Sequence, residues 1–292
     1  MTSPTKISRT PYDPGENPAE LLKGVDARTL REIERVERSP HMFGLTFGKT
    51  LSTAYIHCLH DPTANASETW EAWVAAMQTG SALFASATAP EGATVECMIA
   101  HEKRTVPGLG GPTHFTDPGT WLQAFWLAII CRDQPRMTQL ANVPMELLRG
   151  SEAEFEEYIY SWVEALQTYW LEGEGLGDKL VAAFDGTNPE NLRFVGRELM
   201  LKILYPPLNV FYRFITQDDE EFDKALVQAV ELHHDYWTTS DEERSEDLDG
   251  AVALAPLALA CLAYDAGRPI TVESEYLPEN LLDRSWLGEF PT

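Results

Sequence analysis

Side chains that favour burial recur at three- and four-residue steps along most of this 292-residue chain, and this period restricts it to a helical fold. The clearest case begins at Asn65, which can cap a helix, with Glu68 three residues later to complete a capping box. The stripe that follows consists of Trp70, Trp73, Val74, Met77, Ser81 and Phe84. Because a strand would need a period of two, we predict a helix here.

The same spacing predicts further helices along the chain. Asp117 and Pro118 are a strong helix start, and Ser151 with Glu154 forms a second capping box. Tyr205-Pro206-Pro207 separates two helices, because the residue before a proline disfavours the helical region. The predicted helices cover residues 26–37, 43–59, 65–88, 118–131, 152–170, 176–184, 189–203, 207–216, 218–237 and 251–266, and short extended segments are expected at 94–99 and 270–273. The fold class is therefore all-α, a compact irregular array of about ten helices with mostly antiparallel neighbours.

Residues 1–17 are rich in Pro, Ser and Thr and are expected to form a flexible tail, with a single domain over 18–292. No secretory signal is visible, and the longest apolar run, 251–263, is too short to span a bilayer. The cysteines, which lack metal or redox spacing, are expected to be reduced core thiols. These features predict a cytoplasmic protein.

Acidic residues are concentrated in the second half of the chain. Residues 1–150 contain 16 Asp and Glu against 13 Lys and Arg, whereas residues 151–292 contain 30 against 9. The whole chain has a formal net charge of −24. Such a field repels nucleic acid and anionic membranes and attracts basic partners, although solubility alone could also account for it.

Three acidic runs stand out in that half. Asp218, Asp219 and Glu220, like the run at 152–157, lie near helix starts, where acids interact favourably with the helix dipole. The third run lies in a predicted loop, where that explanation fails. Its members are Asp241, Glu242, Glu243, Glu246, Asp247 and Asp249. We therefore expect the C-terminal runs to form one partner-binding face, with the 241–249 loop as its main part.

The sequence offers only weak metal-ligand candidates. Glu231 and His234 have the Glu-x-x-His spacing of di-iron bundles, but no second such unit exists, and His57 with His60 lacks two further ligands. No nucleophile elbow is present. We therefore expect neither a cofactor nor catalysis. An enzyme, or a protein that binds a small ligand or a metal in a pocket between helices, stays open as an alternative, with Trp73, His57, Tyr212 and His234 as candidate lining residues.

Several segments resemble the immunity protein 49 family of bacterial polymorphic-toxin systems. They are residues 68–74, 77–84, 121–128, 198–207, 272–278 and 286–291. The resemblance covers about residues 40–292 and implies an all-α protein that neutralises a cognate toxin by binding it. Because many such toxins are nucleases with basic substrate surfaces, the resemblance and the acidic charge agree. A regulatory protein that kept the fold and changed its partner is the remaining alternative.

Overall fold

The computed structural model describes residues 4–238 and 242–289, of which the side chains of residues 242 and 243 are not described. The chain is 61% helical and 6% strand, which confirms the all-α prediction. The elements in chain order are β1 (Thr5–Ile7), α1 (Pro18–Arg35), η1 (Pro40–Met42), α2 (Phe43–His60), α3 (Ser67–Thr88), β2 (Thr94–Ile99), β3 (Glu102–Pro107), α4 (Pro118–Ile130), α5 (Gln134–Ala141), α6 (Met145–Arg149), α7 (Glu157–Trp170), α8 (Leu176–Asp185), α9 (Arg197–Leu199), η2 (Met200–Leu204), α10 (Tyr205–Ile215), α11 (Asp219–Thr238), α12 (Glu242–Ser245), η3 (Leu248–Gly250), α13 (Leu254–Asp265), β4 (Val272–Ser274) and α14 (Glu279–Leu282).

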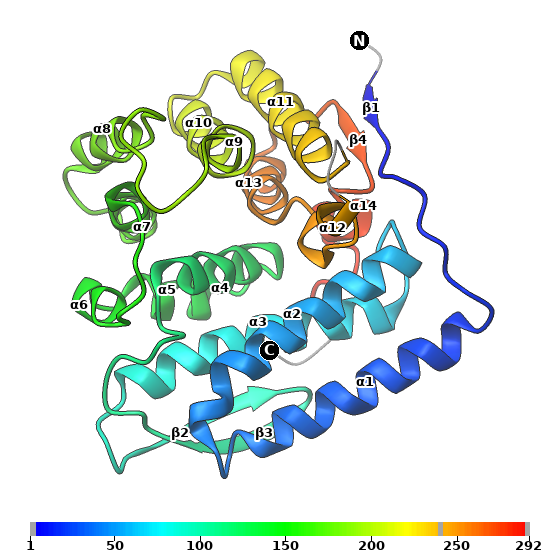
Figure 1. Ribbon diagram of the computed structural model, residues 1–292, viewed down its shortest axis with the longest axis vertical. Coiled ribbons are helices and arrows are strands. Elements are labelled where there is room, and N and C mark those ends of the chain that lie inside the picture. Colours follow the sequence, from blue (N-terminus) through cyan, green and yellow to red (C-terminus); the bar gives the residue numbers. More distant parts are fainter. Residues whose placement is uncertain (1–3, 239–241, 290–292) are drawn as a thin grey trace.

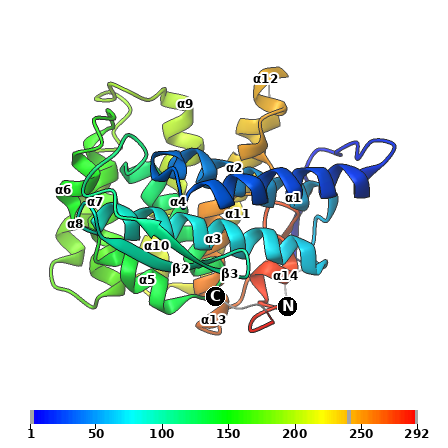
Figure 2. The same cartoon turned by 90° about the horizontal axis from the view of Figure 1, so that it is seen from below.

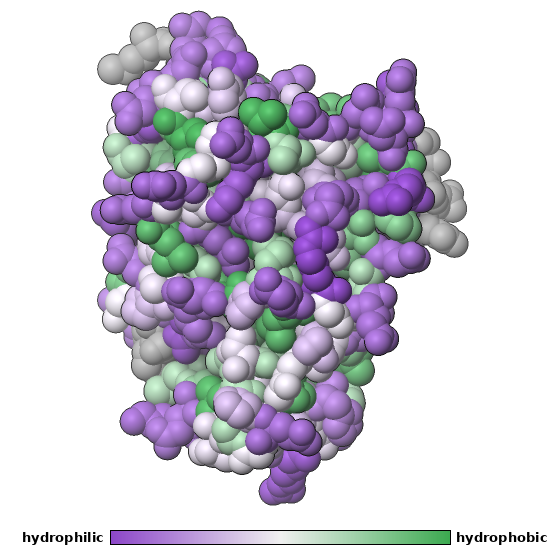
Figure 3. Space-filling model, turned by 90° about the vertical axis from the view of Figure 1, so that its left-hand side faces the viewer, coloured by the Kyte–Doolittle hydropathy of each residue, from purple (hydrophilic) through white to green (hydrophobic). Residues whose placement is uncertain are grey.

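Helices that follow one another along the chain mostly pack side by side (Figure 1). α1, α2 and α3 form one group, with the β2–β3 hairpin against α3, while α7 packs on α8 and α10 on α11. The central helix α13 contacts α4, α10 and α11. On the face shown in Figure 3, apolar side chains lie scattered among polar ones.

Two central helices are buried because they are apolar on nearly every side. In α4, Trp121, Phe125 and Trp126 are at most 3% exposed, as the sequence predicted for a helix without a polar face. Its start is also as predicted, because the Asp117 carboxylate accepts hydrogen bonds from the backbone and hydroxyl of Thr120. The apolar segment Leu248–Asp265 is long enough to cross a membrane by length and composition, yet 56% of it is buried inside the fold, as in the core helix of a globular protein.

Several predicted helix boundaries were wrong. α1 begins at Pro18 rather than at residue 26, and the helix predicted over 189–203 begins only at Arg197. α3 begins at Ser67 without a side-chain cap, and the Asp61 carboxylate accepts from the amides of Asn65 and Ala66, which precede the helix. α7 begins only at Glu157, so the predicted box at Ser151 does not form. Pro206 does not separate two helices, since the π-helical segment η2 leads directly into α10. A π turn leaves room for a residue without an N–H donor.

The N-terminal segment is more ordered than its composition indicated. β1 pairs in parallel with β4, with Thr5 opposite Val272 and Ile7 opposite Ser274. The Arg9 guanidinium then donates hydrogen bonds to the carbonyls of Ala251, at 3.0 Å, and of Cys58, at 2.9 Å. The segment that was predicted to be a flexible tail therefore joins three distant parts of the chain.

Candidate functional site

The acidic segment 242–249 follows the C-terminal end of α11. It was predicted to be a loop, but it contains α12 and the 3-10 turn η3. Figure 2 shows α12 projecting from the body of the molecule. Glu246 and Asp247 are exposed, and the Asp247 carboxylate accepts from the amide of Asp249 at 3.0 Å, which starts η3. Asp241, which was predicted to belong to this site, lies outside the described residues, as do the side chains of Glu242 and Glu243.

Arg244 attaches this projecting segment to the body. Its guanidinium lies 3.2 Å from the Glu198 carboxylate and 4.1 Å from the centre of the Tyr236 ring. Lys202 bridges the same Glu198, at 2.9 Å, to Asp235, at 2.5 Å. The base of the acidic segment is therefore held by an ion-pair network that joins α9, η2, α11 and α12.

Asp218, Asp219 and Glu220 lie at the opposite end of α11 from the acidic segment. Asp218 accepts from the amide of Glu221 at 3.2 Å, Asp219 pairs with Arg268 at 3.5 Å, and Glu220 pairs with Lys224 at 2.7 Å. A 20-residue helix is about 30 Å long. The two acidic runs are therefore separated by the length of α11, and the first run makes local hydrogen bonds and ion pairs.

The metal-ligand candidates do not converge. His234 bonds to the hydroxyl of Tyr276 at 3.1 Å, whereas Glu231 is exposed. His57 lies 2.8 Å from the Asp26 carboxylate, and His60 packs edge-on against the ring of Tyr12. In residues 4–238 and 242–289, no group of three or more metal-ligating side chains comes together.

The cysteines are buried thiols rather than reactive ones. Burial raises the pKa of Cys58, Cys131 and Cys261 to about 12. Because the thiolate is the nucleophilic form, these three groups are unreactive near neutral pH. Cys97, which is half-buried on β2, also has a pKa raised by burial.

A cavity of about 550 Å³ lies between α4, α7, η2, α11 and α13. Trp73, His57, Tyr212 and His234, which were candidate lining residues, do not line it. Trp73 is instead fully buried against Cys58, and Tyr212 is 39% exposed. The apolar wall includes Leu122, Trp126, Ile159, Trp162, Ile203, Leu204, Pro206 and Pro256.

Tyr55, His233, Trp237 and Asp249 give one part of the cavity wall a polar character. Burial lowers the pKa of His233 to about 4, so the ring is neutral at physiological pH, and its Nε2 lies 3.2 Å from the carbonyl of Gly250. Burial raises the pKa of Asp249, and also that of Tyr55. The polar residues come from α2, α11 and η3, so no local motif could have revealed them.

Glu156 holds the loop beside the cavity. Its Oε1 accepts hydrogen bonds from the amides of Arg193, Phe194 and Val195, at 2.5, 2.6 and 3.4 Å. Burial alone would raise the pKa of Glu156, but these donors lower it below its ordinary value. This glutamate, which was part of the third acidic run, is therefore structural.

Glu156→Ala is expected to lower the free energy of unfolding by about 3 kcal/mol, because three amides lose a charged acceptor. Glu156→Gln keeps one acceptor oxygen and should cost about half as much. Denaturant unfolding measures both values, and the amide of Phe194 should exchange faster in Glu156→Ala. Glu154→Ala, at an exposed position, is the control and should change stability by less than about 0.5 kcal/mol. Equal losses of unfolding free energy in Glu156→Ala and Glu154→Ala would contradict the structural role of Glu156.

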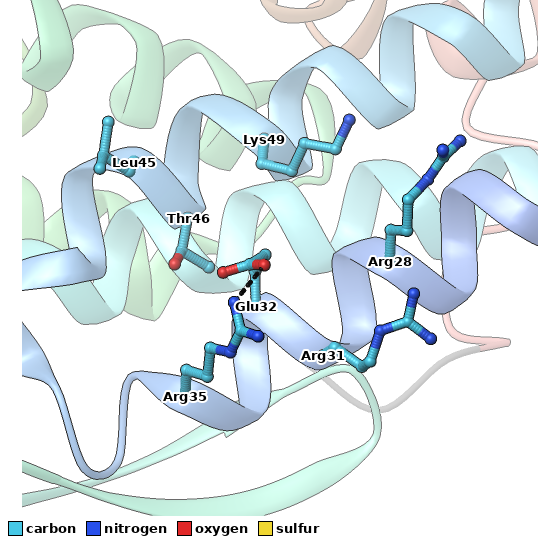
Figure 4. Close-up of a pocket in the computed structure, with 7 residues that line it drawn as sticks. All are labelled: Arg28, Arg31, Glu32, Arg35, Leu45, Thr46 and Lys49. Carbon is cyan, nitrogen blue, oxygen red and sulfur yellow. Dashed lines mark hydrogen bonds and ion pairs between the residues drawn. The ribbon is translucent and has the colours of Figure 1, made fainter.

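A basic groove interrupts the acidic character of the molecule. It lies between α1 and α2, has a volume of about 480 Å³, and is lined by four cations and one carboxylate (Figure 4). Arg35 pairs with Glu32 at 2.6 Å, whereas Arg28, Arg31 and Lys49 have no ion pair within the described ranges. The N-terminal half is therefore nearly neutral in total but locally positive.

The structure thus defines a helical protein with one projecting acidic segment, one basic groove and one apolar cavity. The chain belongs to the immunity protein 49 family, whose sequence profile matches residues 61–281. Membership of this family implies a protein partner. No curated protein and no solved structure matches the chain. The matched region begins at residue 61, directly after α2, so β1, α1, α2 and the basic groove precede it.

Proposed function

We propose that this protein is a cytoplasmic, non-catalytic immunity protein that neutralises a basic toxin of nuclease type by binding it through the acidic segment 242–247. Family membership over residues 61–281 is the observation that carries this proposal. Among the acidic runs, this segment is the one that projects from the body, and its described carboxylates at 246 and 247 are exposed.

Electrostatics would act at two stages of binding. The charge of −24 attracts a basic partner over long range, and the carboxylates of the segment then occupy positions that nucleic-acid phosphates would take. The basic groove between α1 and α2 would repel the same partner. Attraction at one place and repulsion at another would fix the orientation in which the partner docks.

The test compares two triple variants that change the net charge equally. Glu242→Gln, Glu243→Gln and Glu246→Gln neutralise the segment, whereas Glu172→Gln, Glu174→Gln and Asp178→Asn neutralise exposed acids around the start of α8. The partner is the toxin encoded by the neighbouring gene, and its association rate is measured at low and high salt. We expect the segment variant to associate roughly three- to tenfold more slowly at low salt, with a smaller difference at high salt.

The control variant should change the rate by less than about twofold. Equal slowing by both variants would show that net charge acts without a specific segment. Failure of the wild-type protein to bind or neutralise the neighbouring toxin would overturn the immunity function itself.

A further inference from the structure

The cavity between α4, α7, η2, α11 and α13 is larger than ordinary packing defects. Protein interiors seldom contain voids larger than a water molecule. A volume of about 550 Å³ falls within the range of small-molecule pockets. Trp126 and Trp162 are at most 3% exposed and form part of its wall, whereas Leu199 and Ile203 are half-buried. The cavity is therefore deep enough to hold an apolar molecule and accessible from one side.

The cation that lines the cavity is already paired. Lys202 is the cation among the described lining residues, and both Glu198 and Asp235 pair with its ammonium group. The hydrogen bonds that Lys202 donates to these two carboxylates raise its pKa above the ordinary value. His233 is neutral, since burial lowers its pKa to about 4. Two carboxylates, Glu156 and Asp249, also line the cavity. An anionic ligand would thus lose its hydration without gaining a free counter-charge from the described residues, whereas an uncharged one would not.

One polar group in the cavity wall lacks a hydrogen-bond partner. The indole N–H of Trp237 is buried, and it has no hydrogen-bond acceptor within the described part of the chain. Trp237 also packs so closely on η3 that a Cβ at Gly250 would lie 2.9 Å from its Cγ. Because Trp237 lines the cavity, an acceptor group on a ligand would supply the partner that its N–H lacks.

The backbone on one side of the cavity departs from regular α-helix. The π-helical segment Met200–Leu204 forms one side, followed by Pro206 and Pro207. π-helical turns occur frequently at functional sites. Glu156 holds the neighbouring 193–195 loop through three hydrogen bonds. The wall is therefore built from irregular elements that specific contacts keep in place.

We propose that this cavity binds an uncharged apolar small molecule that carries one hydrogen-bond acceptor. The size and the apolar wall of the cavity fit the apolar body of the ligand. No unpaired cation is present among the described lining residues, which disfavours an anion. The indole N–H of Trp237 favours a ligand with a hydrogen-bond acceptor. This proposal goes beyond toxin binding, because it concerns the cavity rather than the exposed carboxylates of the projecting segment.

The test uses two fluorescent probes with the same carbon skeleton. N-phenyl-1-naphthylamine is uncharged, and 8-anilinonaphthalene-1-sulfonate adds one sulfonate. We expect the uncharged probe to bind the full chain saturably at one site and the sulfonate to bind at least about tenfold more weakly. No saturable binding of the uncharged probe, or equal or tighter binding of the sulfonate, would overturn the proposal.

Two variants locate the binding site. Ala229→Phe places a ring in the cavity, and Ile203→Trp narrows it at a half-buried position that tolerates bulk more easily. Each substitution should lower the affinity for the uncharged probe at least about tenfold, and each variant protein should retain a cooperative thermal transition. Ala182→Phe, at an exposed position on α8, is the matched control and should leave binding unchanged. Unchanged binding in a folded Ile203→Trp would place the probe elsewhere and overturn the proposal.

Trp237→Phe tests the acceptor requirement. It removes the indole N–H and retains an aromatic ring. The affinity for 2-decanone, measured by displacement of the uncharged probe, should fall about two- to tenfold, the value of one hydrogen bond. An unchanged affinity for the ketone in this variant would remove the acceptor from the description of the ligand.

Discussion

Replacing Arg132 with methionine is expected to lower the free energy of unfolding by about 3–5 kcal/mol. The Arg132 guanidinium donates to the carbonyls of Ile130 and Leu281 at 2.7 Å and of Leu282 at 2.6 Å. Its Nε also donates to the Asp265 carboxylate at 3.0 Å. The side chain is 8% exposed, so its loss leaves several acceptors without a donor in a mostly dry place.

Arg284→Met is the matched control, because Arg284 contacts the same carboxylate from a more exposed position. Its Nη1 lies 3.6 Å from Asp265, and its side chain is 49% exposed. Such a surface pair contributes about 0–1 kcal/mol. Denaturant unfolding of the two variants measures the difference, and similar losses for both would show that the carbonyl contacts of Arg132 contribute little.

Stability is expected to fall by about 2 kcal/mol through His233 between about pH 7.5 and about pH 5. Burial lowers the pKa of His233 in the folded protein from 6.5 to about 4. The unfolded chain therefore takes up a proton as the pH falls through 6.5, while the folded chain does not until about pH 4. Protonation then favours unfolding across this window.

His233→Gln isolates this contribution, because glutamine retains an N–H donor for the carbonyl of Gly250 but has no titrating ring. Other groups titrate as well, including Asp249, whose raised pKa favours the fold at low pH. The free energy of unfolding is measured by denaturant for wild type and for His233→Gln at about pH 7.5 and about pH 5. The difference between the two proteins should change by about 2 kcal/mol between these pH values. His41→Gln, at an exposed position, should follow the wild type. Parallel pH curves for wild type and His233→Gln would contradict the burial of a neutral ring.

Features that depend only on residues close together in the chain were predicted correctly in several places. The apolar composition of α4 and the Asp117 cap lie within one short segment, and both are as expected. The cap of α3 was assigned to Asn65, but Ala66 occupies the cap position without a side-chain hydrogen bond, and Asp61 accepts from the two amides that precede the helix. Pro206 was interpreted as the boundary between two helices, because the residue before a proline usually leaves the helical conformation. The π-helical segment η2 instead continues into α10.

The candidate sites depended on contacts between distant residues, which a single sequence does not reveal. Glu156 looked like part of an acidic run, but its donors lie 37 to 39 positions further along the chain. The cavity draws its lining from seven α-helices, from η2 and η3, and from the segments between them, and most of the contributing positions look like ordinary core residues. The two acidic runs lie at opposite ends of α11, and the partner-binding face stays a prediction.

The attachment of the N-terminal segment also has a consequence for the order of folding. Helix pairs such as α2–α3, α7–α8 and α10–α11 are neighbours along the chain, so they can form early at little loop-closure cost. The bond from Arg9 to Ala251 spans 242 positions, so its closure costs more loop entropy than the helix pairs do. Ala251 immediately precedes Val252 in the cavity wall. Removal of the first nine residues would therefore remove a bond to the backbone directly beside the cavity wall.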